Sequence, residues 1–507
     1  MLKKITTIEN LKKKIFSYKQ KNKKTILCHG VFDLLHVGHI KHFKEAKTCG
    51  DILVVTITPD IYVNKGPGRP AFNEQLRMEA VASLDVVDYV ALNTTSSAVN
   101  LIKKIKPNIY CKGPDYKDHK NDISEQIKKE INAIKRTGGK VVYTKGITFS
   151  SSKLINSFVN SLSESQKLLV GRIKKDYSFS EIKKQVDEFK KIKVLIIGET
   201  IIDQYIFCEA LGKSGKEPVL ALRDLKKEEY LGGAAAISRH LSSFCNKISL
   251  LSMVGEKGEF LNEIKKKLPK NVNFTYIKKK NSPTILKRRF LDNVSKNKVL
   301  GVYNINDDIL TSAQDKQFYD ITKKIISKYD LVIVTDYGHG LISKKVSKLI
   351  CKSSKYLALN AQVNAANRGY HTMRNYKNVN CVIVNEDEMR HELRDKNSKS
   401  EILMKRLSHE HNIKNLIVTK GVEGALLYNK KEKKFYSSEA LSKTAIDKIG
   451  AGDAMLSIIS LCLKNRLSKD LLLLIGSLAG AQSVNTIGNK EPINKIQILK
   501  SLEHILK

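Results

Sequence analysis

Short apolar runs that alternate with segments of helical period are the feature that most restricts what this chain can fold into. The runs Thr25–Cys28 and Ile52–Thr58 enclose one helical segment, and further runs follow at 88–92, 108–113 and 140–146. Strand, helix and strand in succession form a βαβ unit, because parallel strands need a crossover connection. The pattern therefore predicts an α/β fold with a parallel, doubly wound sheet.

A second series of the same kind follows a polar, helical segment at 158–192 that carries no strand signal. Its apolar runs lie at 193–203, 247–255, 330–338, 356–360, 381–388 and 415–421. A chain of 507 residues is also too long for one ordinary core. We therefore expect a basic N-terminal helix (1–22), a first α/β domain (23–157), a helical linker (158–192) and a larger second α/β domain (193–507).

The chain is strongly basic, with 90 Lys+Arg against 51 Asp+Glu and a formal net charge of +39. Such a field attracts nucleic acid, acidic surfaces or phosphorylated small substrates. The lysines are spread along the whole chain, as an AT-rich coding sequence would give, and no basic stripe with interleaved aromatic residues occurs. We therefore expect no nucleic-acid partner.

Two further classes are disfavoured by the apolar and cysteine patterns. No apolar run reaches the ~18–20 residues that a bilayer-spanning helix needs, and the first residues lack the features of a secretory signal. We expect a cytoplasmic protein with no membrane partner. The eight cysteines have no pair closer than Cys28 and Cys49, which predicts neither a zinc site nor a disulfide framework; we interpret them as reduced and mostly buried.

The segment HGVFDLLHVGH at 29–39 joins the first expected strand to the helix that follows. Gly30 falls at the tight turn, and His36 and His39 fall at the helix start, three residues apart on one face. Exposed backbone N–H groups and the helix dipole make such a helix start an anion site, to which two imidazoles add donors. Core packing or metal binding is the alternative for the two histidines, and the metal interpretation lacks a third ligand at a suitable spacing.

A second glycine-rich turn, DKIGAGDAM at 447–455, precedes a long helical segment. Gly450 and Gly452 allow the backbone N–H groups to turn toward an anion at the helix start. Asp453 lies just inside that helix, where its carboxylate can accept a proton from an attacking hydroxyl. Taken alone, the same pattern is also compatible with a capped helix start that has no chemical role.

The first segment resembles the HxGH signature of the nucleotidyltransferase superfamily, which includes cytidylyltransferases and heptose-phosphate adenylyltransferases. Residues 65–70, 74–77, 112–117 and 149–155 resemble further elements of that family in the expected order. The resemblance covers 23–157 and implies a Rossmann-like domain in which a phosphate oxygen attacks the α-phosphate of a nucleoside triphosphate and expels pyrophosphate. The implied residues are His36 and His39 for catalysis, Gly30, Phe32, Asp33, Gly38, Lys112, Ser150, Ser151 and Ser152 for the nucleotide, and Lys65 and Arg77 for the acceptor phosphate. The serine run is also compatible with a plain loop.

The second turn resembles the GAGD anion hole and base of the ribokinase-like, pfkB-type sugar kinases. Segments 231–241, 385–388 and 419–427 resemble other parts of their pattern, and the likeness spans about 193–490. It implies a ribokinase-like domain with a small β lid, for which 218–230 is the candidate, and a homodimer. The implied residues are Asp453 as base, Gly450, Ala451 and Gly452 as anion hole, Asp203, Gly232 and Gly233 for the sugar, Thr419, Gly421 and Gly424 for the nucleotide, and Asn385 and Glu388 for Mg²⁺.

Within this family the chain most resembles the bifunctional ADP-heptose synthases, through segments 198–205, 284–290 and 334–343. Three features depart from their pattern. The two domains stand in the reverse order, residues 360–376 replace a stretch that contains an acid and a lysine, and Lys448 replaces a threonine before the anion hole.

We therefore expect a bifunctional transferase that uses Mg²⁺ and ATP, or another nucleoside triphosphate, together with a sugar phosphate. The resemblance implies phosphorylation of D-glycero-D-manno-heptose 7-phosphate at C1 and adenylylation of heptose 1-phosphate for surface glycan assembly. One alternative is an active nucleotidyltransferase, CTP-dependent in one version, with a catalytically altered kinase-like domain. Another is a basic nucleic-acid-associated or regulatory protein that uses both folds only for binding.

Overall fold

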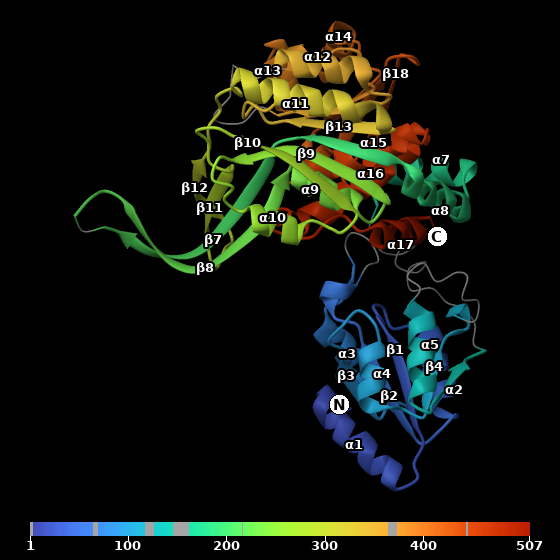
Figure 1. Ribbon diagram of the computed structural model, residues 1–507. Coiled ribbons are helices and arrows are strands. Elements are labelled where there is room, and N and C mark those ends of the chain that lie inside the picture. Colours follow the sequence, from blue (N-terminus) through green and yellow to red (C-terminus); the bar gives the residue numbers. More distant parts are fainter. Residues whose placement is uncertain are drawn as a thin grey trace. The chain divides into compact units, whose positions relative to one another are not determined.

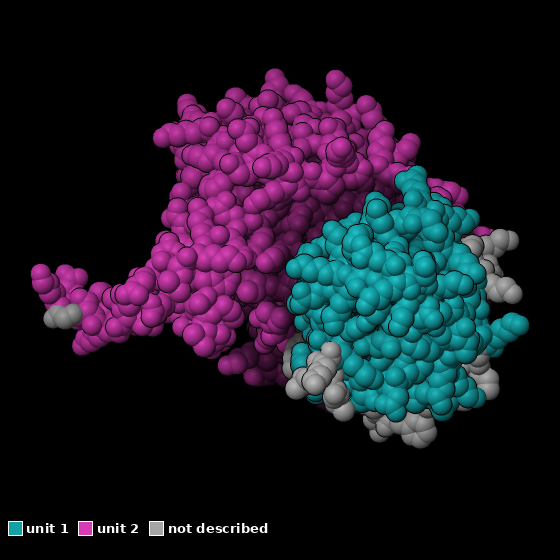
Figure 2. Space-filling model, turned by 90° about the horizontal axis from the view of Figure 1, so that it is seen from below, with its two compact units in different colours: residues 1–163, 499–507 teal, residues 164–498 magenta. Residues whose placement is uncertain are grey.

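The computed structural model describes residues 4–63, 69–116, 126–145, 162–214, 216–362, 373–442 and 445–506. It divides into two compact units, residues 1–163 with 499–507 and residues 164–498 (Figure 2). Lys65 and Ser150–Ser152, which the sequence predicts at the transferase site, lie outside the described residues.

The first unit is built on a five-stranded parallel sheet of order β3-β2-β1-β4-β5 (Figure 1). This order places the first strand at the centre and winds outward in both directions, which confirms the predicted doubly wound sheet. The described elements are α1 (Ile8–Gln20), β1 (Thr25–Gly30), α2 (Val37–Lys47), β2 (Ile52–Ile57), α3 (Glu74–Ala82), β3 (Tyr89–Leu92), α4 (Val99–Ile105), β4 (Ile109–Lys112), α5 (Gln126–Arg136) and β5 (Lys140–Tyr143).

Helices cover both faces of this sheet, and for that reason its central strands are continuously apolar. Phe43 of α2 is buried with Cys28 on one face. On the other face Leu11 and Ile15 of α1 are buried with residues of α4 and α5. The basic N-terminal helix is therefore part of the core of the first unit.

The second unit is built on a nine-stranded sheet of order β10-β9-β6-β13-β14-β15-β16-β17-β18, parallel except for β17 and β18 at one edge. Figure 1 shows α11 and α12 on one face of this sheet and α9, α15 and α16 on the other. The described elements are α7 (Glu164–Asp176), α8 (Phe179–Asp187), β6 (Lys193–Gly198), β7 (Thr200–Lys213), β8 (Leu220–Gly233), α9 (Ala234–Leu241), β9 (Lys247–Gly255), α10 (Leu261–Lys267), β10 (Val272–Lys279), β11 (Leu286–Asp292), β12 (Lys298–Asn304), α11 (Ser312–Ile325), β13 (Leu331–Asp336), α12 (Lys344–Ser353), β14 (Leu357–Ala361), β15 (Cys381–Asn385), α13 (Glu386–Leu393), α14 (Ser400–Glu410), β16 (Asn415–Thr419), β17 (Ala425–Asn429), β18 (Lys434–Ser438), α15 (Ala451–Lys464) and α16 (Lys469–Val484), with α17 (Lys495–Ile505) last in the chain.

A separate four-stranded sheet of order β12-β11-β7-β8 confirms the predicted β lid. The antiparallel pair β7 and β8 extends as a long hairpin away from the main sheet (Figure 1). The apolar run 193–203, expected as one strand, is divided between the two sheets. β6 ends at Gly198, where a Cβ would lie 2.2 Å from the backbone oxygen of Thr335, and β7 begins two residues later in the lid.

The helices of the predicted linker pack on the second unit. The side chain of Gln166 in α7 donates to the backbone oxygen of Ala440 at 2.9 Å, and Arg172 pairs with Asp470 of α16 at 2.8 Å. These contacts explain why residues from 164 onward belong to the second unit and do not form a separate linker.

Candidate active sites

The first turn of α2 brings together the two histidines of the HVGH segment. His36 is the N-cap residue, and its Nδ1 accepts a hydrogen bond from the backbone N–H of Gly38 at 3.0 Å. The His36 and His39 rings stack with their centroids 3.9 Å apart. The Phe32 and His39 rings are nearly perpendicular, with their centroids 5.3 Å apart. A Cβ at Gly30 would lie 2.9 Å from the Phe32 ring, so a larger residue there would displace that ring. The two imidazoles thus lie at a helix N-terminus, where an anion is stabilised.

Asp33 and Arg77 hold the backbone around this turn. Asp33 is buried, and its Oδ1 accepts hydrogen bonds from the backbone N–H groups of Ala71 and Phe72 at 2.7 and 3.1 Å. The buried guanidinium of Arg77 donates to backbone oxygens, including that of Thr58 at 2.9 Å, and pairs with an aspartate. Both side chains are therefore positioning residues in this structure, and their contact with nucleotide or acceptor phosphate stays a prediction.

Lys112 supplies a buried positive charge at the end of β4, next to β1. Its Nζ lies 3.3 Å from Oε2 of Glu130, which also accepts a hydrogen bond from the Tyr110 hydroxyl at 2.8 Å. Burial acts to raise the pKa of Glu130, but Lys112, His29 and the hydrogen bonds from Ala98 and Tyr110 together outweigh burial and lower that pKa to about 2. Burial, followed by the charge of Lys112, lowers the pKa of His29 to about 4. Glu130 was not predicted, because an acid on an amphipathic helix gives no signal that it is buried.

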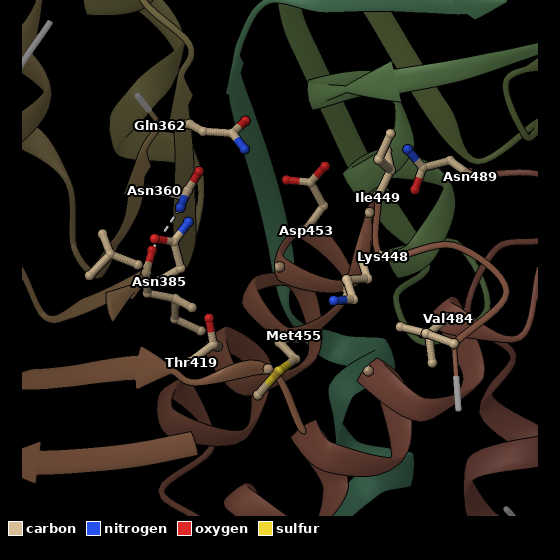
Figure 3. Close-up of a pocket in the computed structure, with 18 of the residues that line it drawn as sticks. Asn360, Gln362, Asn385, Thr419, Lys448, Ile449, Asp453, Met455, Val484 and Asn489 are labelled. Carbon is tan, nitrogen blue, oxygen red and sulfur yellow. Dashed lines mark hydrogen bonds between the residues drawn. The ribbon is translucent and has the colours of Figure 1, made fainter. Parts of the chain in front are cut away.

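The second unit contains a cavity of about 650 Å³ that gathers most of the residues predicted for the kinase. Figure 3 shows Asp453, Lys448, Asn385 and Thr419 projecting from different elements around this space. Predicted residues that line it are Asp203, Gly233, Asn385, Glu388, Thr419, Gly421, Gly424, Gly450, Ala451, Gly452 and Asp453. Gly232 lies beside Asp203, since a Cβ there would be 2.2 Å from its Oδ2.

Asp453 lies in the first turn of α15, which begins after the N-cap residue Gly450 at φ 88°. The hydroxyl of Tyr337 donates to Asp453 Oδ1 at 2.9 Å. Burial raises the pKa of Asp453 to about 7, and Asp203 adds to this shift, whereas the Tyr337 hydrogen bond and Lys287 oppose it. A carboxylate with a pKa near neutrality is suited to act as a general base at physiological pH.

The lid contributes two cations to the same cavity, Lys287 and Arg289 of β11. β11 pairs with β7 in parallel, so Lys287 stands opposite Asp203, and Nη1 of Arg289 pairs with Asp203 Oδ1. This segment contributes to the resemblance to the bifunctional ADP-heptose synthases, but neither cation was among the predicted site residues. The signal that could have identified them was the basic run at 287–289 within an otherwise apolar strand.

Asn385 and Glu388, predicted as magnesium residues, form a capping box at the start of α13. Asn385 Oδ1 accepts from the backbone N–H of Glu388, and Glu388 Oε2 accepts from that of Asn385, both at 2.8 Å. Burial raises the pKa of Glu388 to about 7, and the nearby Asp453 adds to this. Two carboxyl groups with raised pKa values beside one cavity fit a bound divalent cation, which would favour their ionised forms.

Two of the three departures can be placed in the structure. Asn360 and Gln362 line the cavity, and Asn360 donates to the backbone oxygen of Ile383 at 2.7 Å. Lys448 also lines the cavity, two residues before the predicted anion hole at 450–452, and its side chain is labelled in Figure 3. Residues 363–372 of the changed stretch lie outside the described residues.

Comparison with known proteins gives two successive domain matches. Residues 27–184 match the cytidylyltransferase-like family, and residues 191–496 match the pfkB family of carbohydrate kinases. In this chain the transferase domain therefore comes first. The expectation that this order is reversed relative to known bifunctional proteins receives no support from the comparisons.

Similar curated proteins are named bifunctional protein HldE. The one from Aliarcobacter butzleri is 37% identical over 138 residues, which are 27% of this chain and 29% of that protein. The one from Campylobacter jejuni strain RM1221 is 26% identical over 319 residues, which are 62% of this chain and 66% of that protein. In each of these matches the chain spans less than two thirds of the length of the relative.

Among solved structures, phosphofructokinase-2 from Escherichia coli in complex with potassium is 14% identical and has a TM-score of 0.51. The match covers 62% of this chain and all of that one, and at this identity it supports the fold alone. Among the described residues, no helix is long and apolar enough to cross a membrane. Because the kinase family matches more than half of the chain and the predicted kinase residues meet in one cavity, the chain belongs to the pfkB family of carbohydrate kinases and carries a cytidylyltransferase-like domain before the kinase domain.

Proposed function

We propose that this chain is a bifunctional enzyme that phosphorylates a sugar phosphate in its second unit and transfers a nucleotidyl group to a sugar phosphate in its first. The observation that carries the proposal is the position of Asp453. It lies at a helix N-terminus beside three residues of glycine-rich turn, in one cavity with Asp203, and its pKa is about 7. The two domain matches and the relatives named HldE support the pairing of these activities.

In the kinase step, Asp453 accepts the proton of the attacking sugar hydroxyl. The N–H groups of residues 450–452 and the positive end of α15 then offset the charge of the transferred phosphoryl group. Asn385 and Glu388 would hold Mg²⁺, which supplies charge neutralisation for the phosphates when bound. Phosphoryl transfer of this kind depends on positioning and charge more than on covalent chemistry.

The two cations of the lid favour a phosphorylated sugar as the kinase substrate. Arg289 pairs with Asp203, and Lys287 stands beside them, so two cations of the lid line the sugar side of the cavity and could bind a phosphate of the substrate. Together with the relatives, this supports heptose 7-phosphate as the acceptor and C1 as the site of transfer. We include a homodimer in the proposal, since the lid hairpin exposes Leu211 and Leu220.

In the transferase step, the acceptor phosphate attacks the α-phosphate of ATP and pyrophosphate leaves. His36 and His39 donate hydrogen bonds to the triphosphate at the start of α2, and Lys112 offsets charge from the adjacent strand. The protein aligns the two phosphates, and no covalent enzyme intermediate is needed. The kinase converts heptose 7-phosphate to the 1,7-bisphosphate and so supplies the C1 phosphate that the transferase acceptor carries. A separate phosphatase must hydrolyse the C7 phosphate between the two reactions.

The test measures ADP formation with heptose 7-phosphate and pyrophosphate release with heptose 1-phosphate, using ATP and CTP in turn. We expect Asp453→Asn to abolish the first activity and leave the second, and His36→Ala to do the reverse. Each variant is thereby the control for the other unit. Persistence of ADP formation in Asp453→Asn, or of pyrophosphate release in His36→Ala, would contradict the assigned roles.

The alternative is an active nucleotidyltransferase joined to an altered kinase. Asn360 and Gln362 favour it, because they place neutral amides in the cavity within the stretch that differs from the pattern of the bifunctional family. Pyrophosphate release without ADP formation, with sugar phosphate still bound by the second unit, would support this alternative.

A further inference from the structure

The first unit gathers two thiols and an imidazole that are far apart in the sequence. Cys28 lies on β1, Cys111 on β4 and His42 on α2, and their potential ligand atoms all lie within 4.8 Å of one another. β1 and β4 are neighbours, and Cys28 and Cys111 are register partners. Both cysteines belong to the core cluster that contains Phe43 of α2, so they lie on the face that this helix covers.

We propose that Cys28, His42 and Cys111 bind one thiophilic divalent cation, zinc, with a water molecule at the fourth position. Thiolate sulfur and imidazole nitrogen are the ligands that zinc prefers. Zinc binds them at about 2.3 and 2.0–2.1 Å, so ligand atoms around a tetrahedral ion lie about 3.5–3.8 Å apart. The separations here are at most 4.8 Å, so they need to shrink by no more than about 1 Å, which side-chain rotation can supply.

A polar contact fixes the ring of His42 beside the two thiols. Its Nδ1 lies 3.0 Å from the hydroxyl oxygen of Thr144, a contact that orients the ring as the outer partners of metal-bound histidines do. His42 is only half-buried, whereas the two cysteines are 0% and 1% exposed, so it provides the route by which an ion enters.

A bound cation would also balance the charge of the two ligating thiolates. Two buried thiolates are unstable without a compensating charge, and one zinc ion supplies both positive charges. The neighbouring Lys112 is paired with Glu130 at 3.3 Å, which reduces its repulsion of an incoming cation.

A zinc ion at this position would link the three elements that carry the transferase residues. β1 ends at Gly30, α2 begins beside His36, and β4 ends at Lys112. The ion would hold these three elements together beneath α2. The role we infer is structural, and it does not depend on either activity proposed above.

The test measures zinc in the full-length protein after purification under reducing conditions without added metal, by inductively coupled plasma mass spectrometry. We expect one zinc ion per chain, and its loss in Cys111→Ser and His42→Ala. Cys49→Ser is the matched control, because Cys49 is a half-buried thiol of the same unit outside the group, and it should retain zinc. Circular dichroism of each variant shows whether it has folded.

A second measurement needs no variant. Replacement of zinc by cobalt should give the thiolate-to-cobalt absorption of a site with two sulfur ligands. No zinc or cobalt uptake by the reduced wild-type protein would overturn the proposal, as would a Cys28–Cys111 disulfide in the isolated protein or equal zinc loss in Cys49→Ser. These readouts contain no enzyme activity, so their failure is distinct from a failure of the proposed function.

Discussion

The hydrogen bond from Tyr337 to Asp453 makes a quantitative prediction for the kinase. The Tyr337 hydroxyl donates to Oδ1 at 2.9 Å, and the backbone N–H of Tyr337 donates to Glu199 at 3.0 Å, which fixes the backbone of this residue. The hydrogen bond stabilises the ionised carboxylate and lowers the pKa of Asp453 against burial and Asp203, which raise it. Tyr337→Phe removes this hydroxyl and keeps the ring, so the pKa of Asp453 should rise.

The size of the shift follows from the strength of the bond. A hydrogen bond to a charged group contributes about 1.5–3 kcal/mol, and the half-buried position of Asp453 favours the lower end of this range. Since 1.36 kcal/mol corresponds to one pKa unit, the pKa should rise by about one unit from its value of about 7. At pH 7 the ionised fraction then falls from about one half to about one tenth, and kcat/KM for ADP formation falls about fivefold.

The assay is the pH profile of kcat/KM for ADP formation, which reports groups of the free enzyme. We expect the acid limb of Tyr337→Phe to move to higher pH and the two profiles to converge at high pH, where Asp453 is ionised in both. Tyr303→Phe is the control, because Tyr303 lines the same cavity over Lys287 and Arg289, and its profile should not move. An equal loss at every pH, or an acid limb that moves to lower pH, would refute the reasoning.

Three further predictions address the anion hole, the buried ion pair and the lid. Gly450→Ala places a Cβ at φ 88° and 2.2 Å from a side-chain oxygen, so it should destabilise the protein by about 1–3 kcal/mol in urea unfolding and abolish ADP formation. Glu130 has a pKa of about 2 when folded and 4.5 otherwise, so its stabilising contribution is full above pH 4.5 and is lost as the pH falls through 2. Glu130→Gln should therefore lower the free energy of unfolding at pH 7 by about 3 kcal/mol, measured by denaturant titration, and should remove this pH dependence. Arg289→Gln leaves Asp203 without its ion pair and should raise KM for the sugar phosphate about 10–100-fold in the ADP assay.

Each of these variants has a matched control in the chain. Gly171→Ala adds a methyl group that meets nothing within 4 Å, Glu164→Gln neutralises an acid that is 86% exposed, and Arg288→Gln removes the neighbouring arginine of β11, which pairs with Gln204. We expect small effects from all three. If a control variant loses as much activity or stability as its test variant, the change acts through general destabilisation.

The sequence predicted the features that depend on local pattern. It did not predict the residues that are brought together by pairing of strands far apart in the chain. Alternating apolar runs predicted the parallel sheets, and the glycine-rich turn at 447–455 singled out Asp453, which lies in the cavity with residues 450–452. Lys287 and Arg289 reach the cavity only because β11 pairs with β7 in a second sheet. Cys28 and Cys111 meet because β1 and β4 are adjacent in the winding order, a relation that no spacing rule for zinc ligands contains.

Asn385 and Glu388 show how one pattern can carry two meanings. An asparagine followed three residues later by a glutamate is a helix-start signature, and the two side chains do form the capping box. The box uses Oε2 of Glu388, yet Glu388 still lines the cavity, and Asp453 contributes to raising its pKa to about 7. The cap therefore holds a carboxyl group where a cation would stabilise its charge. The local and the functional interpretation describe the same geometry, because a side chain that must be fixed beside a phosphate site is well fixed by the first turn of a helix.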